Sequence, residues 1–590
     1  MVSEASQQHE HDVEEEMFNE IIPGYQLTID KILKTGVTLF PNNEIVYWPP
    51  NGRRLHFTFK EFNERVNRLG WVLEELGVVS GNPRKMGTRV AIFDWNTHRF
   101  LELLYAVPMY GAVLQPVNIR LAPEEIVYVM NKSKDEVAFV NVDFLPLIKA
   151  VAPKLEYLRK IVVMHDGEEP IKIERIGKAE VYDYEELMKE AREFNYPEEL
   201  DEKTVMVMMY TSGTTGLPKA TIFRHREIVL HAIAVLIIAV WSWYPVHYLR
   251  FIKNAYNPLG VPSLLLVPFY HVLGWGAPYY NIMGGTPKIV LPGRYDWNHI
   301  VKLIKEEGVK NAGGVPTMLY LTLSSPELKD VDLRGFLWSL GGAAATKGLI
   351  EEARKRGVIL VNGYGMTETA PVVIVPTLPP DLMAELSEEQ IQELIVDSIG
   401  KPLPFVQARV VDEYGRDVPR DGKTVGELVL RAPWITLGYY GDPEKTREAF
   451  RDGWFHTGDL ATWDERGFIY IVDRAKDVIK SGGEWISSLK LESIISLHPA
   501  VAEVAVIGAT HEKWGERPVA IIVPRPGQRI TEDDIKNYLM QFVDRGEIPK
   551  WWIPDRIVFV DELPKTGAAK IDKKALRERY RDILIKQRSQ

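Results

Sequence analysis

The chain of 590 residues contains no cysteine. Disulfides, thiolate metal sites and a cysteine nucleophile are therefore all excluded. Basic residues are not in excess either: the formal net charge is −10, which argues against a broad nucleic-acid-binding surface. The first residues, MVSEASQQHEHDVEEEMF, lack the basic and apolar regions of a signal peptide. We therefore expect a solvated N-terminal tail on a soluble, cytoplasmic protein.

One long run has no charge at all. Residues 228–249 contain no Asp, Glu, Lys or Arg, and the run is long enough for a membrane span. Pro245, His231 and His247 lie inside it and weaken that interpretation. A helix buried in the protein core is the alternative that we favour, so no integral membrane span is expected.

The pattern of elements predicts an α/β fold with more than one domain. The composition, 46% hydrophobic and 26% charged, is typical of a globular protein, and the length exceeds that of a usual single domain. Strand-like and helix-like segments alternate through the first 400 residues, as in βαβ units with parallel sheets. Examples are the strand 89–93, the helix 98–110, the strand 111–117, the strand 288–291, the helix 298–307 and the strand 337–341.

The pattern changes in the last third of the chain. From 399 to 470 short strands separated by turns predict a small β-barrel or sandwich. After about Lys476 a compact unit follows, with strands at 501–508, 519–524 and 556–560. Thr531, followed by three acidic residues, predicts the start of a helix over 533–543.

The stretch YTSGTTGLPK, residues 210–219, predicts a phosphate-binding loop. Gly213 and Gly216 allow close approach to an anion, hydroxyls and backbone N–H groups can surround it, and Lys219 adds a charge. The hydroxyl residues are Thr211, Ser212, Thr214 and Thr215. The spacing differs from the Walker pattern, because no hydroxyl follows Lys219. A flexible loop is the alternative, but the apolar strand 205–209 leads into the segment and favours phosphate binding.

This loop resembles the signature of the adenylate-forming superfamily, which includes acyl-CoA synthetases, aryl-CoA ligases, beetle luciferases and peptide-synthetase adenylation domains. Further segments resemble the family's motifs in the family's order: GYGMTE (363–368), GELVLRAPWITLGYY (426–440), GWFHTGD (453–459), DRAKDVIKSGGEWIS (473–487) and PKTGAAK (564–570). The resemblance implies a large N-terminal AMP-binding domain, residues 1–475, with two βα-layered subdomains and a small β-barrel. A small, mobile α+β lid, residues 477–590, would turn about a hinge at Lys476.

The resemblance also implies which residues bind the cofactors ATP and coenzyme A. The loop residues Thr211 to Lys219 would hold the β- and γ-phosphates, Tyr364 would stack on adenine, and Asp459 would accept the ribose hydroxyls. Gly482 and Gly483 would line the pantetheine channel of CoA after the lid has turned. The other residues expected at the nucleotide are Gly341, Gly342, Ala343, Gly363, Gly365, Arg474 and Lys476.

Three residues would carry the adenylation chemistry. Thr367 would contact the α-phosphate, and Glu368 would bind Mg²⁺, with Thr215 as a second oxygen ligand. A Thr-Glu pair could instead cap a helix. Lys570 would bridge the acid's carboxylate and the α-phosphate. The chain departs from the family pattern at Ala569 and Ala220, where glycines are usual.

The substrate pocket is implied by four positions, of which His271 is also expected to act in catalysis: His271, Trp275, Gly341 and Gly365. Trp275 resembles a residue that gates a fatty-acid tunnel, which the 228–249 helix would flank. As core residues, His271 and Trp275 would have no such role. Gly365 stands where acetate-specific relatives carry bulky residues, so we interpret it as room for a longer acyl group.

The resemblance therefore implies an AMP-forming carboxylic acid:CoA ligase for a medium- to long-chain fatty acid. Its partners would be the acid, ATP and CoA, without nucleic acid; related enzymes form homodimers through the N-terminal domain. CoA is favoured over a tethered carrier because few residues follow Lys570. Open alternatives are a ligase for a short-chain acid, a hydroxy acid such as 4-hydroxybutyrate or an aryl acid, and a non-catalytic acyl- or nucleotide-binding homologue. A luciferase-like oxidase is a further alternative, because Lys480 occupies a position where such enzymes also carry a lysine, although lysines there are common.

Overall fold

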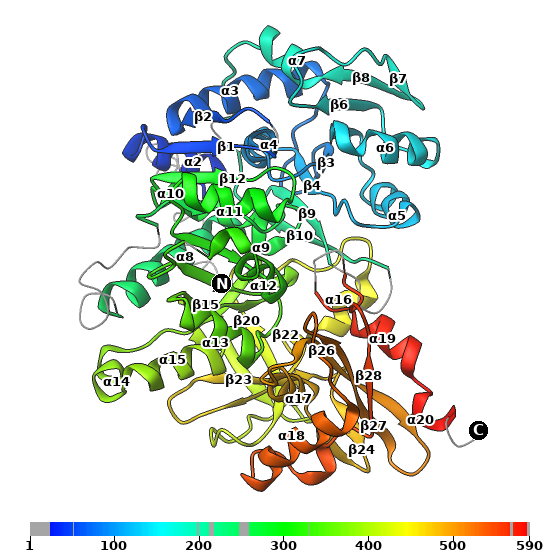
Figure 1. Ribbon diagram of the computed structural model, residues 1–590. Coiled ribbons are helices and arrows are strands. Elements are labelled where there is room, and N and C mark those ends of the chain that lie inside the picture. The colour runs from blue at the N-terminus through cyan, green and yellow to red at the C-terminus, as the bar shows by residue number, and fades with distance from the viewer. Residues whose placement is uncertain are drawn as a thin grey trace, which may run out of the picture.

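The computed structural model describes residues 24–50, 52–197, 200–211, 217–246, 259–329, 331–566 and 570–586. Two large sheets organise its N-terminal part (Figure 1). The eight-stranded sheet has the order β10 (Ala220–Arg224), β9 (Val205–Tyr210), β4 (Val113–Pro116), β3 (Arg89–Phe93), β5 (Val137–Asn141), β6 (Lys160–Met164), β8 (Ala179–Asp183), β7 (Arg175–Ile176). The seven-stranded sheet has the order β15 (Ile359–Asn362), β14 (Leu337–Leu340), β13 (Asn311–Gly314), β11 (Ser263–Leu264), β12 (Lys288–Leu291), β1 (Glu44–Tyr47), β2 (Leu55–Thr58).

Both sheets are mainly parallel, as the alternating pattern predicts. Antiparallel pairs occur at their margins, between β9 and β10, β7 and β8, and β1 and β2. The helices that connect the strands are α3 (Phe59–Glu75), α4 (His98–Met109), α5 (Pro123–Ser133), α6 (Leu145–Val151), α7 (Tyr184–Glu190), α11 (Trp297–Glu306), α12 (Pro316–Leu323) and α13 (Lys347–Lys355). The predicted strand 288–291 coincides with β12, and the predicted helices 98–110 and 298–307 correspond to α4 and α11.

Helix α4 lies between the two sheets. It contacts β4 and β9 on one side and β1 on the other, and all of its residues are buried. Thr97 begins the helix, because its hydroxyl accepts a hydrogen bond from the N–H of Phe100. The largest hydrophobic cluster surrounds this helix and joins side chains from both sheets.

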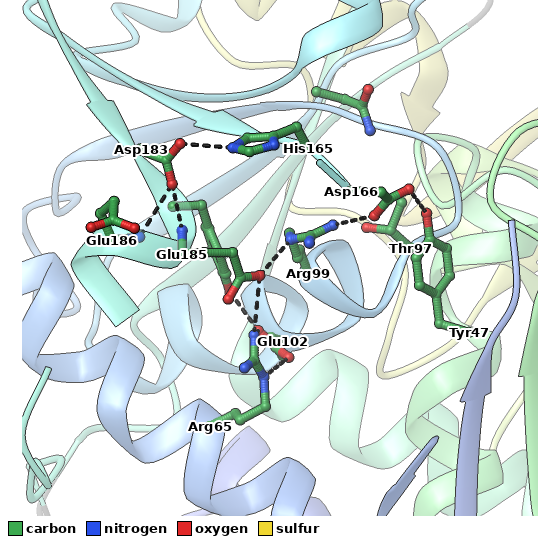
Figure 2. A network of polar contacts seen from close by, with 12 residues as sticks. Tyr47, Arg65, Thr97, Arg99, Glu102, His165, Asp166, Asp183, Glu185 and Glu186 are labelled. Atoms are coloured by element: carbon green, nitrogen blue, oxygen red, sulfur yellow. Dashed lines mark hydrogen bonds and ion pairs between the residues drawn. The ribbon is translucent and has the colours of Figure 1, made fainter. Parts of the chain in front are cut away.

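The charged residues of α4 are buried with partners (Figure 2). The carboxylate of Glu102 accepts from Arg65 at 2.5 Å and from the hydroxyl of Tyr184. Arg99 donates to Asp166 at 2.9 Å and to Glu185 at 2.8 Å. Each buried charge has an opposite charge within hydrogen-bond distance, so this network ties α3, α4, α7 and the end of β6 together as a structural element.

The apolar run 228–249 corresponds mostly to helix α8 (His225–Val246); the residues after 246 lie outside the described chain. The helix packs on α2 (Ile29–Leu39), α10 (Ala277–Met283), α14 (Pro380–Glu385) and β10. Its N-terminal half is buried, as the core-helix interpretation expects. None of the helices within the described ranges has the length and apolarity needed to cross a membrane.

Two small antiparallel sheets follow, and the segment predicted as a barrel or sandwich, residues 399–470, contributes the last strand of the first sheet and most of the second. Strands β16 (Tyr364–Gly365), β17 (Val372–Val375) and β18 (Lys401–Pro402) form the first. Strands β19 (Gln407–Val411), β20 (Gly426–Arg431), β22 (Trp454–Trp463), β21 (Phe450–Arg451) and β23 (Ile469–Arg474) form the second. A bridge between Gly400 and Ile469 joins them. Helices α15 (Glu388–Asp397) and α16 (Pro443–Ala449) complete this region.

The C-terminal unit is α+β, as predicted, and occupies the lower right of Figure 1. Its sheet has the order β25 (Glu484–Ile486), β24 (Ile479–Ser481), β27 (Gly515–Pro524), β26 (Val501–His511), with β28 (Arg556–Phe559) paired to β27. The helices are α17 (Ser488–Ile495), α18 (Glu532–Asp544), α19 (Lys573–Tyr580) and α20 (Ile583–Lys586). Thr531 caps α18 through reciprocal hydrogen bonds with Asp534, as the sequence predicts.

Candidate active site

The predicted phosphate loop connects two antiparallel neighbours, β9 and β10. At its base the N–H of Thr211 donates to the carbonyl of Lys219 at 2.9 Å, and the N–H of Lys219 donates to Oγ1 of Thr211 at 3.3 Å. These bonds close the loop and hold the lysine at its end. The remaining predicted loop residues lie outside the described chain: Ser212, Gly213, Thr214, Thr215 and Gly216.

The ammonium of Lys219 lies over the ring of Tyr439, 4.6 Å from its centroid. The hydroxyl of Tyr439 donates to Oε1 of Glu368 at 2.7 Å. Glu368 and Thr367 belong to a short 3₁₀ turn, Thr367–Thr369, that follows β16. Lys219, the predicted phosphate ligand, and Glu368, the predicted metal ligand, therefore both contact Tyr439. Sequence reasoning did not identify Tyr439 as a site residue, although it lies within the motif of residues 426–440.

A single carboxylate suits the expected Mg²⁺. Within the described ranges no group of three His, Asp or Glu residues could hold a metal on protein ligands alone. Mg²⁺ in phosphoryl-transfer enzymes commonly uses one or two carboxylates and takes its other ligands from phosphates and water. Glu368 at the end of β16, near Lys219, fits that requirement.

Asp459 receives partners from two different segments. The hydroxyl of Tyr364 donates to its Oδ2 at 2.7 Å, and Nε of Arg474 lies 3.4 Å from its Oδ1. Asp459 on β22 pairs directly with Arg474 on β23, which explains why they meet. Burial raises the pKa of Asp459, while Arg474 and the Tyr364 hydroxyl act in the opposite direction. The predicted adenine and ribose residues are thus together.

Lys570 reaches the same site from the C-terminal unit. A Cβ on Gly342 would lie 3.0 Å from Cε and 3.2 Å from Nζ of Lys570. The carbonyl of Lys570 accepts from the N–H of Thr566 at 2.7 Å, which closes the loop that carries it. Burial lowers the pKa of Lys570 to about 8, Arg474 acts in the same direction, and Asp459 opposes the shift.

The predicted glycines at 341, 342 and 363 follow two neighbouring parallel strands. Gly341 and Gly342 follow β14, and Gly342 has a φ of +78°, which favours glycine. Ala343 comes next and is exposed. Gly363 follows β15 and donates its N–H to the carbonyl of Leu340 at 2.9 Å. These residues lie at the carboxyl ends of parallel strands, where ligands of open α/β sheets bind.

Gly482 and Gly483 are not gathered with Lys570. They form the turn between β24 and β25, with φ values of +62° and +91°. The N–H of Gly482 donates to the carbonyl of Trp514 at 2.8 Å, and a Cβ there would meet the Trp514 ring at 2.8 Å. In this arrangement the turn contacts its own unit and leaves Lys570 at the nucleotide residues.

Contacts between β23 and the C-terminal helices flank Lys476. Asp473 accepts from the N–H and hydroxyl of Ser488, at 2.7 and 2.8 Å. Arg577 on α19 pairs with Asp477. Burial and the nearby Arg474 lower the pKa of Lys476. The predicted hinge residue therefore lies where the two parts of the chain are connected.

His271 and Trp275 begin and end the short helix α9 (Val272–Trp275), of which His271 is the N-cap. Trp275 is completely buried; its ring stacks on Phe223 of β10 and meets Tyr279 edge-on, with centroids 6.4 and 5.4 Å apart. His271 lies beside Tyr270, with ring centroids 4.8 Å apart. In this conformation Trp275 is buried directly behind the strand that leaves the phosphate loop, and its role at the acyl pocket stays a prediction.

Glycine is required at position 365 by the packing of the backbone, independently of the size of the substrate. A Cβ at this position would lie 1.8 Å from the carbonyl oxygen of Pro371, so no side chain fits. This contact requires glycine whatever the substrate, and our interpretation of Gly365 as room for a longer acyl group stays a prediction. At Gly341 a Cβ would meet Leu273 at 3.1 Å, which places Leu273, a residue that sequence reasoning missed, beside the predicted carboxyl site.

Comparisons with known proteins identify the family of the chain. A family model described as AMP-binding enzyme matches residues 33–440, and its C-terminal-domain model matches residues 490–570. A long-chain-fatty-acid–CoA ligase from Thermus thermophilus is 40% identical, over 94% of this chain and 96% of the relative. A 3-methylmercaptopropionyl-CoA ligase from Ruegeria pomeroyi is 37% identical, over 88% and 91%.

A solved structure of ATP-bound MatB from Rhodopseudomonas palustris has a TM-score of 0.74 and 26% identity, over 93% of this chain and 99% of that chain. The sequence and fold agree along nearly the whole length of these proteins. The chain therefore belongs to the AMP-binding enzyme family, as an acid–CoA ligase of the AMP-forming type.

Proposed function

We propose that this ligase converts a medium- to long-chain fatty acid to its acyl-CoA through an acyl-adenylate. The observation that carries the proposal is the position of Lys570. Its ammonium lies against Gly342 and interacts electrostatically with Asp459 and Arg474. The fatty-acid substrate is supported by the Thermus thermophilus relative, which is named for long-chain fatty acids.

In the first half-reaction a carboxylate oxygen attacks the α-phosphorus of ATP, and pyrophosphate leaves. Lys570 would donate to both the carboxylate and the α-phosphate, while Lys219 and Thr211 hold the outer phosphates. Thr367 would contact the α-phosphate. Mg²⁺ on Glu368 would neutralise phosphate charge. Asp459 would bind the ribose hydroxyls, and the Tyr364 ring would lie against adenine.

In the second half-reaction the CoA thiolate attacks the acyl carbonyl, and AMP leaves. We propose that residues 477–590 first turn about Lys476, which removes Lys570 and brings the Gly482–Gly483 turn to the site. Residues 1–475 would remain in place. Exchanging one face of the lid for another keeps water away from the hydrolysable acyl-adenylate.

A ligase for a short acid is the second candidate. The Ruegeria pomeroyi relative is named for 3-methylmercaptopropionate. In addition, the ring of Trp275 packs against the rings of Phe223 and Tyr279. If Trp275 gates the acyl tunnel, as the resemblance implies, a long acyl chain requires this ring to shift, whereas a short acid does not. The two candidates therefore differ in what Trp275→Ala should do.

The test follows the loss of CoA thiol with ATP and Mg²⁺ across acids from acetate to palmitate, with 3-methylmercaptopropionate, 4-hydroxybutyrate and benzoate. A maximum at octanoate or longer supports the fatty-acid proposal, and Trp275→Ala should then extend the range further. A maximum at four carbons or fewer, unchanged in Trp275→Ala, would select the short-acid candidate.

Lys570→Ala tests the division between the half-reactions. We expect ATP–pyrophosphate exchange to fall by roughly 10²–10³, the usual effect of losing one positioned donor. Thioester formation from supplied acyl-AMP should persist. Equal losses in both half-reactions would contradict the proposed role of Lys570.

A further inference from the structure

Residues 436–440, the bridging segment, connect the strand after the phosphate loop to the turn that carries Glu368. The N–H of Tyr440 donates to the carbonyl of Ala220 at 2.8 Å, and the N–H of Leu437 donates to that of Ile222 at 3.3 Å. On the other side, the N–H of Thr436 donates to the carbonyl of Glu368 at 2.8 Å. The backbone of the bridging segment thus fixes β10 and the Glu368 turn relative to each other.

The hydroxyl of Thr436 strengthens this connection. It donates to the carbonyl of Ile222 at 3.0 Å and accepts from the N–H of Ile222 at 3.1 Å. The hydroxyl of Thr446 accepts from the N–H of Tyr439 at 3.0 Å. The course of the segment is therefore determined by backbone groups and two threonines, and it does not depend on the hydroxyl of Tyr439.

The side chain of Tyr439 makes two further contacts, each with a different charge. Its ring faces the ammonium of Lys219, and its hydroxyl donates to Oε1 of Glu368. The tyrosine is 7% exposed, and Lys219 and Glu368 are half-buried, so both contacts are partly shielded from bulk water. Among the ion pairs of the described chain there is none between Lys219 and Glu368, although both charges contact this one side chain.

A cation and an anion this near each other attract strongly where water is scarce. A direct ion pair would occupy both groups, and the phosphates and the metal would have to break it. An aromatic ring offers the ammonium a weaker partner, and a phenol hydroxyl orients one carboxylate oxygen. Tyr439 satisfies both charges without joining them, so each remains available for its ligand.

We propose that Tyr439 is a positioning residue that keeps Lys219 and Glu368 apart and orients them toward the phosphates and Mg²⁺ of ATP. This inference rests on the proposed roles of Lys219 and Glu368 in the adenylation reaction. Oε1 of Glu368 accepts the hydrogen bond from Tyr439, and the carboxylate oriented in this way would hold the metal.

Three variants separate the parts of this role. Tyr439→Phe keeps the ring under Lys219 and removes the hydroxyl from Glu368. Tyr439→Leu removes both contacts. Tyr440→Phe is the matched control, since it deletes the neighbouring hydroxyl, which has no hydrogen-bond partner among the described residues, and leaves the backbone bond to Ala220.

Calorimetry of ATP binding without acid, with and without Mg²⁺, gives a readout independent of turnover. For Tyr439→Phe we expect the Mg²⁺ concentration that gives half of the metal-dependent increase in ATP affinity to rise about 10- to 100-fold. Removing other groups that orient metal ligands has an effect of this size. Metal-free ATP binding should be unchanged. Tyr439→Leu should also weaken metal-free ATP binding, because Lys219 can then pair with Glu368.

ATP–pyrophosphate exchange completes the test. The KM for the acid should be the same in wild type, Tyr439→Phe and Tyr440→Phe. A wild-type Mg²⁺ dependence in Tyr439→Phe would overturn the inference while leaving the proposed function intact. An equal loss of acid, ATP and Mg²⁺ binding would overturn it in favour of a packing role. No exchange in the wild type would instead overturn the proposed function, and this inference with it.

Discussion

The hydroxyl of Tyr364 donates to Oδ2 of Asp459 at 2.7 Å, across a separation of 95 residues. Tyr364 begins the strand β16, and Asp459 lies within β22, so the bond joins the two small sheets. Arg474 approaches the other carboxylate oxygen. A tyrosine expected only to stack on a base therefore also orients the carboxylate expected to bind the sugar.

Tyr364→Phe should weaken ATP binding about tenfold, because a hydrogen bond to a charged group contributes roughly 1.5–3 kcal/mol. The tyrosine hydroxyl lowers the pKa of Asp459 against the effect of burial. Removal of the hydroxyl should raise the pKa of Asp459 further. As the pH is lowered, the variant should therefore begin to lose affinity for ATP at a higher pH than the wild type does. Calorimetric titrations at several pH values measure both effects; parallel pH profiles would contradict the coupling.

Much of this site could be predicted because the chemistry is concentrated in short motifs. The strand before Thr211 and the strand end before Tyr364 were identified from local sequence, and the lysine at 570 was identified through the resemblance of its motif to the family's. The adjacency of Asp459 and Arg474 depends on the register of β22 and β23, which no local pattern reveals. Sequence reasoning placed each of them at the nucleotide without seeing that they form a pair.

Gly342→Ala should displace the ammonium of Lys570. Gly342 has a φ of +78°, and the added Cβ would lie 3.0 Å from Cε of Lys570. Displacing the ammonium by a fraction of an ångström to about 1 Å can cost on the order of 10²-fold in rate. We expect ATP–pyrophosphate exchange to fall by about that factor, while thioester formation from supplied acyl-AMP is retained.

Gly308→Ala is the control for backbone strain. Gly308 has a φ of +65°, and a Cβ there would meet nothing within 4 Å. The two variants should lose similar stability in thermal unfolding, yet only Gly342→Ala should lose exchange activity. Equal activity in both would show that Lys570 does not approach Gly342 in the reacting enzyme.

The pH dependence of adenylation should report Lys570. Burial lowers the pKa of this ammonium to about 8, and it must be protonated to donate to the carboxylate and phosphate. The kcat/KM for ATP–pyrophosphate exchange should therefore fall as the pH rises through about 8, since this ratio follows the unliganded enzyme. Lys570→Arg keeps its charge at all these pH values, so its lower activity should not show this decline. The same decline in both would assign it to another group.

Two features of the site depend on packing and could not be predicted from sequence. Gly365 was interpreted through substrate size alone, and the requirement for glycine that the carbonyl of Pro371 imposes was not foreseen. Tyr439 was quoted only as part of a motif, because its importance depends on Lys219 and Glu368 approaching it from distant segments. In both cases the deciding contact is made by a residue that local sequence does not place.

The segment that delivers His271 is held by one side chain from the other large sheet. Nδ2 of Asn96 donates to the carbonyls of Leu265 and Val267, each at 2.8 Å, and its Oδ1 accepts from the N–H of Phe269 at 3.0 Å. Asn96 follows β3 and is 1% exposed. Its amide thus connects the eight-stranded sheet to the loop that leads from β11 into α9.

Asn96→Ala should leave those backbone groups without partners in a buried site, and each unsatisfied group costs about 1–3 kcal/mol. We expect the free energy of unfolding to fall by about 3 kcal/mol and the KM for the acid to rise, with the KM for ATP little changed. Asn281→Ala is the matched control: Asn281 is equally buried, but it bonds within its own helix and the following turn, to Ala277 and Thr286. It should lower stability without changing the KM for the acid. If both variants shift that KM alike, general loosening of the core explains the effect; a shift confined to Asn96→Ala means that this amide positions the acyl pocket.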